Sequence, residues 1–333
     1  MLHAENRETM QTILGAGGQI AVELARELHK HYTSEIRLVG RHPRNVQESD
    51  RLFAADLMNA AETFEAIRGS DIAYLTVGLP METKVWRQCF PVIMKNVIGA
   101  CERYDVKLVF FDNTYMYPQD DRLQTERTAF APVGKKGAIR AKMAEMLLAE
   151  MDRGRIEAVI CRAPEFYGPG LTKSITNSLV FSRIKRRAES EILLSDHTLR
   201  TLIWTPDAAR ATALIGNTPD AYGQTWHLPC DDARLTYAQI MSRASEVVGR
   251  PLPYRVLSRG QLWWKALKSK RQRELRELLP RYACDCLFDS TKFKRRFPNF
   301  SIMSYPSGIE KILAKPDAVP RSVCRDCFGQ RDA

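Results

Sequence analysis

The chain has 333 residues, of which 44% are hydrophobic and 27% charged, so it is long enough to bury one large core or two smaller ones. It contains no run of the roughly eighteen apolar residues that cross a membrane. The opening residues MLHAENRETMQ are polar and lack the apolar centre of a signal peptide, so we expect a cytoplasmic protein without a membrane partner.

The formal net charge of +11 is concentrated in basic runs, among them RIKRR at 183–187 and KALKSKRQRELRELLP at 265–280. These runs are not interleaved with stacking aromatic residues, and no nucleic-acid-binding motif accompanies them. We therefore expect no nucleic-acid partner. The runs are interpreted as solvated helix faces, with an anionic partner or substrate as the alternative.

The first half of the chain alternates between short apolar runs and longer segments with helical spacing of apolar residues. This repetition is typical of a doubly wound parallel sheet with helices on both faces, which is an α/β fold of the Rossmann type. The expected strands are 10–14, 35–39, 52–54, 72–77, 106–111 and 156–162, and the expected helices are 19–31, 59–67, 83–104 and 137–152.

The regular alternation ends after the stretch RAPEFYGPG at 162–170. We expect a Rossmann domain over residues 8–165 and a smaller substrate-binding lobe over 166–315, interleaved with the last strands of the sheet. Residues 316–333 are polar and contain proline, so they are expected to form a tail.

Three glycines stand between the first expected strand and the first expected helix, in the stretch ILGAGGQIAVEL. Gly15, Gly17 and Gly18 would let the main chain approach a pyrophosphate, whose charge the helix start would stabilise. Ala21 is small enough for the helix to pack closely on the strand. The alternative is a glycine-rich turn without a ligand.

The end of the second expected strand bears on which dinucleotide such a turn would bind. An NAD site usually carries an acidic residue there, whereas this chain has Gly40, followed by Arg41 and Arg44. Because arginine pairs well with a 2′-phosphate, we expect NADP(H) rather than NAD. Asp56 and Leu57, after the third strand, stand where an adenine contact often lies.

Four motifs in order resemble the NAD-dependent epimerase/dehydratase family, the extended branch of the short-chain dehydrogenase/reductase superfamily. They are GAGGQIA at 15–21, DNTYMYP at 112–118, RAPEFYGPG at 162–170 and TLIWTPDAARA at 201–211, the last with Asp207 as its acid. The resemblance implies a nicotinamide dinucleotide cofactor and a small-molecule substrate. The residues further expected at the cofactor are Gln19, Ile20, Val77, Gly78, Lys136, Pro164 and Phe166.

The catalytic positions depart from the family pattern. The family uses Tyr-x-x-x-Lys on the helix after the fifth strand, but this chain has PVGKKGAIRAK and no tyrosine there. One register places Lys136 at the tyrosine position and Arg140 at the lysine position, while another uses Lys142 as the lysine. Asn113 falls at the usual serine or threonine position, with Thr114 beside it.

A Lys-x-x-x-Arg pair resembles the NADPH-dependent isoflavone-reductase-like branch, in which a lysine serves where the tyrosine would. Lys136 and Arg140 share one helix face, and a nearby arginine would favour the neutral lysine that a general base requires. Solvated charges on an ordinary helix are the alternative. Tyr115, Tyr117 and Tyr167 are alternative proton donors from loops, although aromatic packing would also explain them.

Three functions follow from these features. The first is an NADP(H)-dependent oxidoreductase acting on a small carbonyl, alcohol or activated alkene. The second is a nucleotide-sugar epimerase or dehydratase, whose substrate diphosphate would be held by basic residues. The third is a non-catalytic protein that senses NADP(H). The basic residues considered for the diphosphate are Arg183, Lys185, Arg186 and Arg187.

Two further features leave alternatives open. The helices expected over 83–104 and 137–152 are the ones that form a dimer seam in relatives, so a homodimer is an open alternative to a monomer. Cys284 and Cys286 with Cys324 and Cys327 could close a tetrahedral zinc site, but one residue between the first two is tight for metal ligands. We therefore expect free thiols and no metal.

Overall fold

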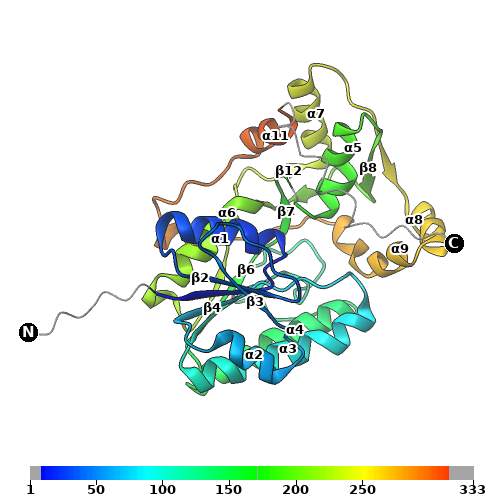
Figure 1. Ribbon diagram of the computed structural model, residues 1–333. Coiled ribbons are helices and arrows are strands. Elements are labelled where there is room, and N and C mark those ends of the chain that lie inside the picture. The colour runs from blue at the N-terminus through cyan, green and yellow to red at the C-terminus, as the bar shows by residue number, and fades with distance from the viewer. Residues whose placement is uncertain (1–8, 171, 315–333) are drawn as a thin grey trace, which may run out of the picture.

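The computed structural model describes residues 9–170 and 172–314. Its centre is a parallel sheet of seven strands in the order β11-β6-β5-β4-β1-β2-β3 (Figure 1). Because all neighbouring strands run parallel, their carboxyl ends meet along one edge of the sheet, where open α/β folds bind ligands. The strands are β1 (Gln11–Leu14), β2 (Ile36–Gly40), β3 (Arg51–Ala54), β4 (Ile72–Leu75), β5 (Lys107–Asp112), β6 (Ala158–Arg162) and β11 (Thr225–His227).

Helices cover both faces of this sheet (Figure 1). On one face α1 (Gln19–His31) packs beside α6 (Thr205–Gly216). On the other face α2 (Ala60–Ile67), α3 (Thr83–Tyr104) and α4 (Lys135–Asp152) lie side by side. Each face has a separate apolar core, since the strands are buried on both sides. This arrangement confirms the predicted α/β doubly wound fold.

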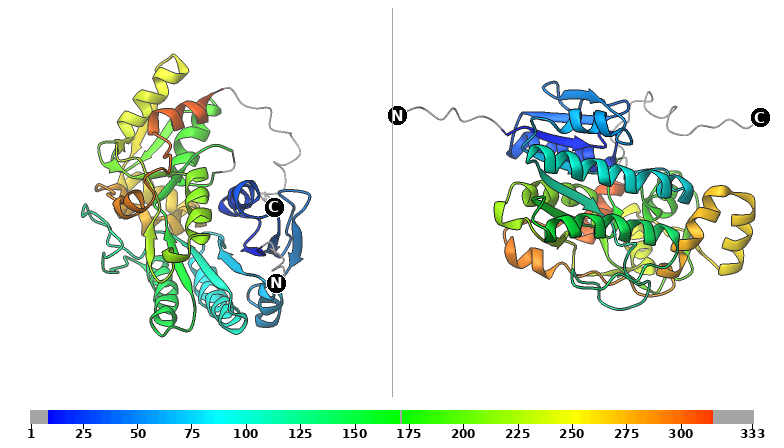
Figure 2. Two further views of the ribbon diagram at one scale, coloured as in Figure 1. Left: turned by 90° about the vertical axis from the view of Figure 1, so that its left-hand side faces the viewer. Right: turned by 90° about the horizontal axis from the view of Figure 1, so that it is seen from below.

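A smaller lobe with its own apolar core stands at the carboxyl edge of the sheet (Figures 1 and 2). Three short pairs of strands and several helices build it. The paired strands are β7 (Glu165–Tyr167) with β10 (Leu202–Trp204), β8 (Ser190–Leu193) with β13 (Tyr254–Leu257), and β9 (Leu199–Arg200) with β12 (Leu235–Thr236). The helices are η1 (Asn177–Phe181), α5 (Ser182–Lys185), α7 (Tyr237–Val248), α8 (Arg259–Lys268), α9 (Lys270–Leu275), η3 (Arg276–Tyr282) and α11 (Tyr305–Leu313).

The lobe and the sheet are interleaved in sequence. The chain leaves the sheet after β6, enters the lobe, and returns to the sheet through α6, η2 (Pro219–Ala221) and β11. It then goes back to the lobe, while α10 (Thr291–Arg296) contacts β11. The expected boundary near residue 165 therefore marks the first departure from the sheet.

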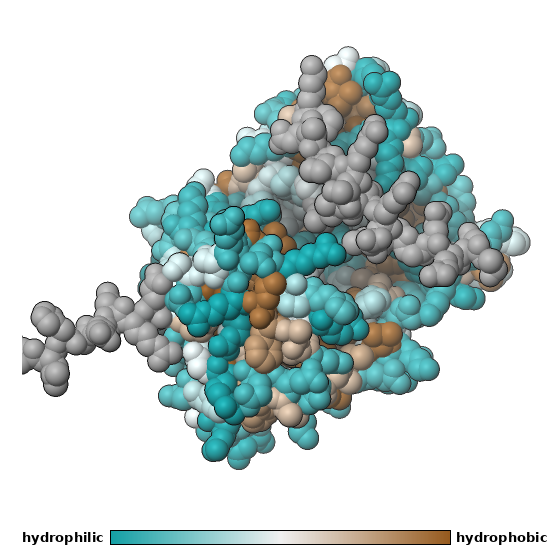
Figure 3. Space-filling view, in the orientation of Figure 1, coloured by the Kyte–Doolittle hydropathy of each residue, from teal (hydrophilic) through white to brown (hydrophobic). Residues whose placement is uncertain are grey.

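The surface seen in Figure 3 is mostly polar, with small apolar patches between the charged side chains. None of the helices in the described part of the chain combines the length and apolar character that a membrane span requires.

Candidate functional site

The glycine turn lies between β1 and α1 at the carboxyl edge of the sheet. Gly15 has a φ of 105°, and a Cβ atom there would lie 2.9 Å from the backbone N and Cα atoms of Val77. By contrast, a Cβ atom on Gly17 would meet nothing within 4 Å. Gly18 is the N-cap of α1 and supplies no side chain to cap the first turn. The turn is therefore tightly held on one side and open on the other, as an anion cradle requires.

Arg41 and Arg44 follow Gly40, the last residue of β2, and both are exposed. Neither side chain forms a hydrogen bond or ion pair with any residue in the described ranges. The sequence from Gly40 to Arg44 contains no acidic residue. These two cations are thus free to meet an anion beside the glycine turn.

The other positions expected at the cofactor surround the same edge of the sheet. The side-chain oxygen of Gln19 accepts a hydrogen bond from the backbone amide of Lys173, which draws the lobe against the start of α1. The carboxylate of Asp56 accepts from the Met58 amide in the turn before α2. Leu57 follows β3, Val77 and Gly78 follow β4, and Pro164 follows β6, whereas Ile20 lies in the first turn of α1 and Phe166 in β7.

Lys136 is the second residue of α4, and only 1% of its surface is exposed. Its Nζ atom donates to Thr83 Oγ1 at 2.7 Å, to Glu274 Oε2 at 2.5 Å and to the Glu274 carbonyl oxygen at 3.0 Å. Its backbone amide donates to Glu277. The ammonium group is therefore fully partnered.

This contact stabilises the charged form of the Glu274 carboxylate. Burial alone would raise its pKa, but hydrogen bonds from Lys136 and Thr83 outweigh burial and lower the pKa to about 2. Lys136 and Glu274 thus form an ion pair across the boundary between the sheet and the lobe.

Arg140 does not act on Lys136 in the way expected from the sequence. Its guanidinium forms an ion pair with Asp112 at the end of β5 and stacks over the rings of Phe90 and Phe110. Arg140 is therefore not a free cation beside Lys136, because Asp112 pairs with Arg140 and Glu274 pairs with Lys136. Lys142 is exposed on α4, whereas Lys136 is buried at the start of the same helix.

Asp112 also begins a buried chain of hydrogen bonds. Its second oxygen pairs with Arg162, whose Nη1 atom donates to the Tyr117 hydroxyl at 2.6 Å. Tyr117 in turn donates to His227 Nε2 at 2.7 Å, and His227 Nδ1 donates to the Asp289 carbonyl at 2.8 Å. Burial first, and then the charge of Arg162, lower the pKa of His227 to about 3, so the ring is neutral. Tyr117 is thus engaged in the core.

Of the three loop tyrosines, Tyr115 is the one beside Lys136. Its backbone oxygen lies where a Cβ on Gly137, the next residue of α4, would be. Its ring stacks on Trp86, and burial raises the pKa of its hydroxyl. Tyr167 is instead buried in the core of the lobe between Trp204 and Tyr305.

The other two candidates on this loop are held by their neighbours. The side-chain oxygen of Asn113 accepts from the Tyr115 amide at 2.9 Å. The Thr114 hydroxyl accepts from Arg281 Nη2 at 2.8 Å, and the same guanidinium lies over the ring of Tyr115. Arg281 therefore reaches from the lobe to the loop after β5.

Residues 270–282, which form α9 and η3, contribute site residues that sequence reasoning missed. Glu274, Glu277 and Arg281 all contact Lys136 or the loop after β5. This segment belongs to a basic run that the sequence interprets as a solvated helix face. In the sequence, the feature that distinguishes this segment from a solvated basic face is the pair Glu274 and Glu277. These acidic residues are three positions apart and share one helix face.

Arg200, at the end of β9, is a second buried cation near this segment. Only 1% of its surface is exposed, and its Nη1 atom donates to the carbonyl oxygens of Arg281 and Cys284. The Nε atoms of Arg200 and Arg281 are both buried without a hydrogen-bond partner. Neither guanidinium forms an ion pair with a carboxylate in the described part of the chain. Buried Arg200 and half-buried Arg281 thus have no carboxylate partner among the described residues.

The basic residues first considered for a substrate diphosphate lie elsewhere. Arg183 donates to the Glu189 carbonyl oxygen at 2.5 Å and lies 3.8 Å from the Glu191 carboxylate. Lys185, Arg186 and Arg187 are exposed at the end of α5. The structure therefore brings none of these four to the start of α4.

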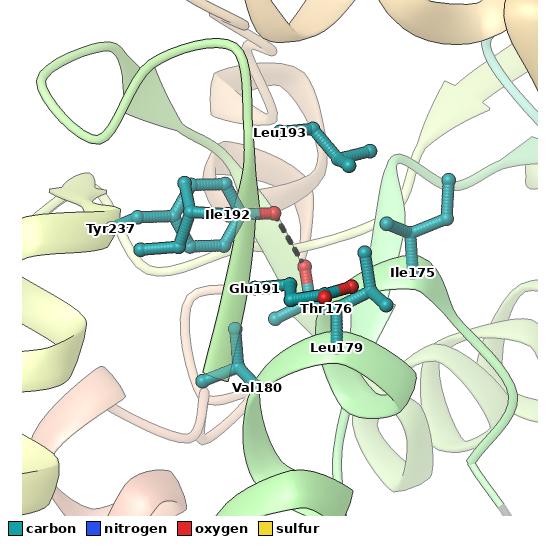
Figure 4. Close-up of a pocket in the computed structure, with 8 residues that line it drawn as sticks. All are labelled: Ile175, Thr176, Leu179, Val180, Glu191, Ile192, Leu193 and Tyr237. Atoms are coloured by element: carbon teal, nitrogen blue, oxygen red, sulfur yellow. Dashed lines mark hydrogen bonds between the residues drawn. The ribbon is translucent and has the colours of Figure 1, made fainter. Parts of the chain in front are cut away.

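A small cavity lies inside the lobe between η1, β8 and the start of α7 (Figure 4). Figure 4 shows the Tyr237 hydroxyl hydrogen-bonded to Thr176, with apolar side chains from η1 and β8 around them. The cavity contains none of the predicted site residues. We regard it as a packing defect of the lobe.

The zinc alternative falls partly beyond the described residues, since Cys324 and Cys327 lie outside them. Cys284 is partly buried and Cys286 buried, and both are free thiols. Within residues 9–170 and 172–314, no three histidine, cysteine or acidic side chains gather as metal ligands would.

Comparison with solved structures supports the same fold. The chain resembles UDP-glucuronic acid 4-epimerase from Bacillus cereus with a TM-score of 0.72 and 15% identity, covering 90% of this chain and 96% of the other. For UDP-glucose 4-epimerase from Thermus thermophilus the TM-score is 0.70 at 14% identity, covering 90% and 97%. For the dTDP-glucose 4,6-dehydratase DesIV from Streptomyces venezuelae it is 0.72 at 14% identity, covering 91% and 95%.

No curated protein sequence is significantly similar to this chain. The model of the NAD dependent epimerase/dehydratase family matches residues 12–228, which include β1 to β6, the glycine turn and the start of α4. This match confirms the resemblance predicted from the four motifs. The chain belongs to the NAD dependent epimerase/dehydratase family, a family of enzymes.

Proposed function

We propose that this protein binds NADP(H) at the carboxyl edge of its sheet and uses it to reduce or oxidise a small carbonyl or alcohol. The observation that carries the cofactor part is the pair of unpartnered cations, Arg41 and Arg44, beside the open side of Gly17. The turn fits a pyrophosphate, and the arginines fit a 2′-phosphate that an acid would repel. The solved neighbours contain NAD. The preference for NADP(H) is therefore proposed for this chain alone, from its own arginines.

A bound nicotinamide supplies or accepts the hydride. In the direction of reduction, the Lys136 ammonium donates its proton to the oxygen of the carbonyl as the carbon receives the hydride. Thr83 and Glu274 hold the Lys136 side chain in place until substrate enters. Tyr115 is partly buried beside the start of α4, and its ring stacks on Trp86.

The substrate carries an anionic group in this proposal. Arg200 is buried and Arg281 half-buried, both Nε atoms are buried, and neither guanidinium pairs with a carboxylate in the described ranges. A cation withdrawn from water is stabilised when an anion meets it. This observation also favours a second candidate, a nucleotide-sugar epimerase or dehydratase, because a diphosphate would satisfy both arginines. The neighbours act on such compounds, as the UDP-glucuronic acid and dTDP-glucose enzymes do by name.

The test is NADPH consumption by the purified protein with aldehydes and ketones, alone and with a carboxylate or phosphate group, and with UDP- and dTDP-sugars. We expect turnover of an anionic carbonyl compound that Lys136→Met abolishes and Lys142→Met leaves unchanged. Lys142 is exposed on the same helix, so it is the matched control. Conversion of nucleotide sugars without net NADPH consumption would favour the second candidate, and equal loss in both variants would contradict the role of Lys136.

A further inference from the structure

Helix α8 (Arg259–Lys268) is the outermost element of the lobe, and with α9 it projects from the body of the molecule (Figures 1 and 2). Only two of its side chains, Leu262 and Ala266, are buried. On its outer side Trp263 is 45%, Trp264 62% and Leu267 52% exposed. We call these last three residues the tryptophan patch.

The tryptophan patch is continuous. The two indole rings pack edge to face with their centroids 5.2 Å apart, and Leu267 follows them at helical spacings of three and four residues. Large aromatic side chains are usually at least half buried in a domain core, because leaving them in water forfeits their hydrophobic free energy. Three adjacent exposed apolar residues at a protruding tip therefore indicate a contact surface.

The elements that carry and adjoin the tryptophan patch, α8, α9 and η3, bear positive charge that the described residues do not neutralise. Five cations on α8, α9 and η3 form no hydrogen bond or ion pair through their side chains with described residues. The carboxylates nearby are engaged elsewhere, since Glu274 pairs with Lys136 and Glu191 pairs with Lys265. The five cations are Arg259, Lys268, Arg271, Arg273 and Arg276.

We propose that the tryptophan patch and its surrounding cations dock this protein onto an anionic membrane surface. Indole rings favour the boundary between headgroups and acyl chains, while lysine and arginine side chains remain among anionic headgroups. Each cation near such a surface adds attraction that salt screens. The sequence alone predicts no membrane partner, because it lacks a spanning segment and does not reveal which face of α8 is exposed.

Charge argues against a second copy of the chain as the occupant. A symmetric dimer through α8 would bring the same five cations against one another, while the two carboxylates of α9 and η3, Glu274 and Glu277, already pair with Lys136. A nucleic acid would satisfy the cations, but it would leave Leu267 and the adjoining indole rings without an apolar partner. An anionic membrane satisfies both features.

The test is co-sedimentation of the full chain with vesicles of phosphatidylcholine alone and with 30% phosphatidylserine. We expect binding to the anionic vesicles at least about tenfold tighter than to neutral ones, weakening as salt rises. Brominated acyl chains should quench tryptophan fluorescence, since they reach only indoles that enter the membrane.

Two variants, each with a control, separate the contributions. Trp263→Ser with Trp264→Ser should remove the quenching and weaken binding about tenfold, whereas Leu123→Ser, at another exposed apolar side chain, should not. Arg271→Glu with Arg273→Glu should abolish the preference for anionic vesicles, whereas Lys30→Glu with Arg127→Glu should preserve most of it. Thermal unfolding of all variants should match the wild type.

Three results would overturn the proposal. These are equal binding to both kinds of vesicle, binding to heparin or single-stranded DNA without binding to vesicles, and a dimer in solution that the Trp263→Ser and Trp264→Ser substitutions dissociate.

Discussion

Single residues decide whether the glycine turn accepts a ligand. Gly15 and Gly17 are two positions apart, yet the structure sets opposite demands on them. Gly15 has a positive φ and touches the backbone of Val77, whereas the space over Gly17 is open. We therefore predict a structural role for Gly15 and a role in ligand binding for Gly17.

Alanine substitutions should separate these two roles. Gly15→Ala should lower the free energy of unfolding by about 1–3 kcal/mol, because an L side chain is strained at this φ and collides with Val77. Gly17→Ala should leave unfolding unchanged but weaken nucleotide binding at least about tenfold, since its methyl group enters the space for the pyrophosphate. Thermal unfolding with and without nucleotide measures both. Unchanged nucleotide binding in Gly17→Ala would contradict the assignment.

The sequence predicted the turn between β1 and α1, because three glycines within four residues are unusual unless the main chain needs a tight turn or a close approach there. The pairing of Lys136 with Glu274 was not predictable, since 138 positions separate the two in the chain. Arg140 was likewise assigned to the cofactor face by helical spacing, but spacing gives no indication that Asp112 at the end of β5 lies within reach.

At the scale of elements, α9 and η3 act as a strap over the start of α4. Lys136 is held from this segment by Glu274, and Glu277 packs where a Cβ on Gly134 would lie. A side chain of the sheet domain is thus satisfied by a carboxylate of the lobe.

Removing the charge of Glu274 tests how much the strap contributes. Glu274→Gln should lower the free energy of unfolding at pH 7 by about 1–3 kcal/mol, because buried Lys136 loses its counter-ion. Glu145→Gln, at an exposed position of α4, is the control and should change it by less than about 0.5 kcal/mol. Denaturant unfolding measures both. A null effect of Glu274→Gln would mean that the strap does not stabilise Lys136.

Sequence periodicity predicted the elements of the sheet domain well. The helices α1 and α3 begin and end where expected, and α4 begins two residues early, because Gly134 rather than Gly137 precedes its first turn. The strands of the lobe were not predicted. They are only two to four residues long, so they carry too little alternation to read, and their partners are distant in sequence.

In the molecule as a whole, the buried hydrogen bonds that run from Asp112 through Arg162 and Tyr117 to His227 connect β5, β6 and β11. The last member is a neutral histidine in the core. Because burial and Arg162 depress the pKa of His227 to about 3, the unfolded chain takes up a proton below about pH 6.5 that the folded chain does not.

Stability should therefore fall as pH drops from 6.5 toward 3, with His227 contributing at most about 1.4 kcal/mol per pH unit. His227→Gln keeps an acceptor for the Tyr117 hydroxyl but cannot titrate. Its unfolding free energy should therefore decline less steeply with acid than that of the wild type. At pH 7 its unfolding free energy should be lower. His197→Gln, at an exposed histidine, should retain the wild-type slope. Urea unfolding at several pH values measures the slopes. Identical slopes in wild type and His227→Gln would exclude the contribution of this group.

We expect the carboxyl edge of the sheet to bind NADP(H), with the pyrophosphate at the open turn and the 2′-phosphate at Arg41. Isothermal titration of the wild type with NADPH and NADH tests it most directly, with Arg41→Ala as the variant and Arg127→Ala as an exposed control. We predict that NADPH binds at least about tenfold tighter than NADH, and that Arg41→Ala alone removes the difference. Equal or tighter binding of NADH to the wild type would contradict the phosphate preference, and the absence of binding by either nucleotide would contradict the site.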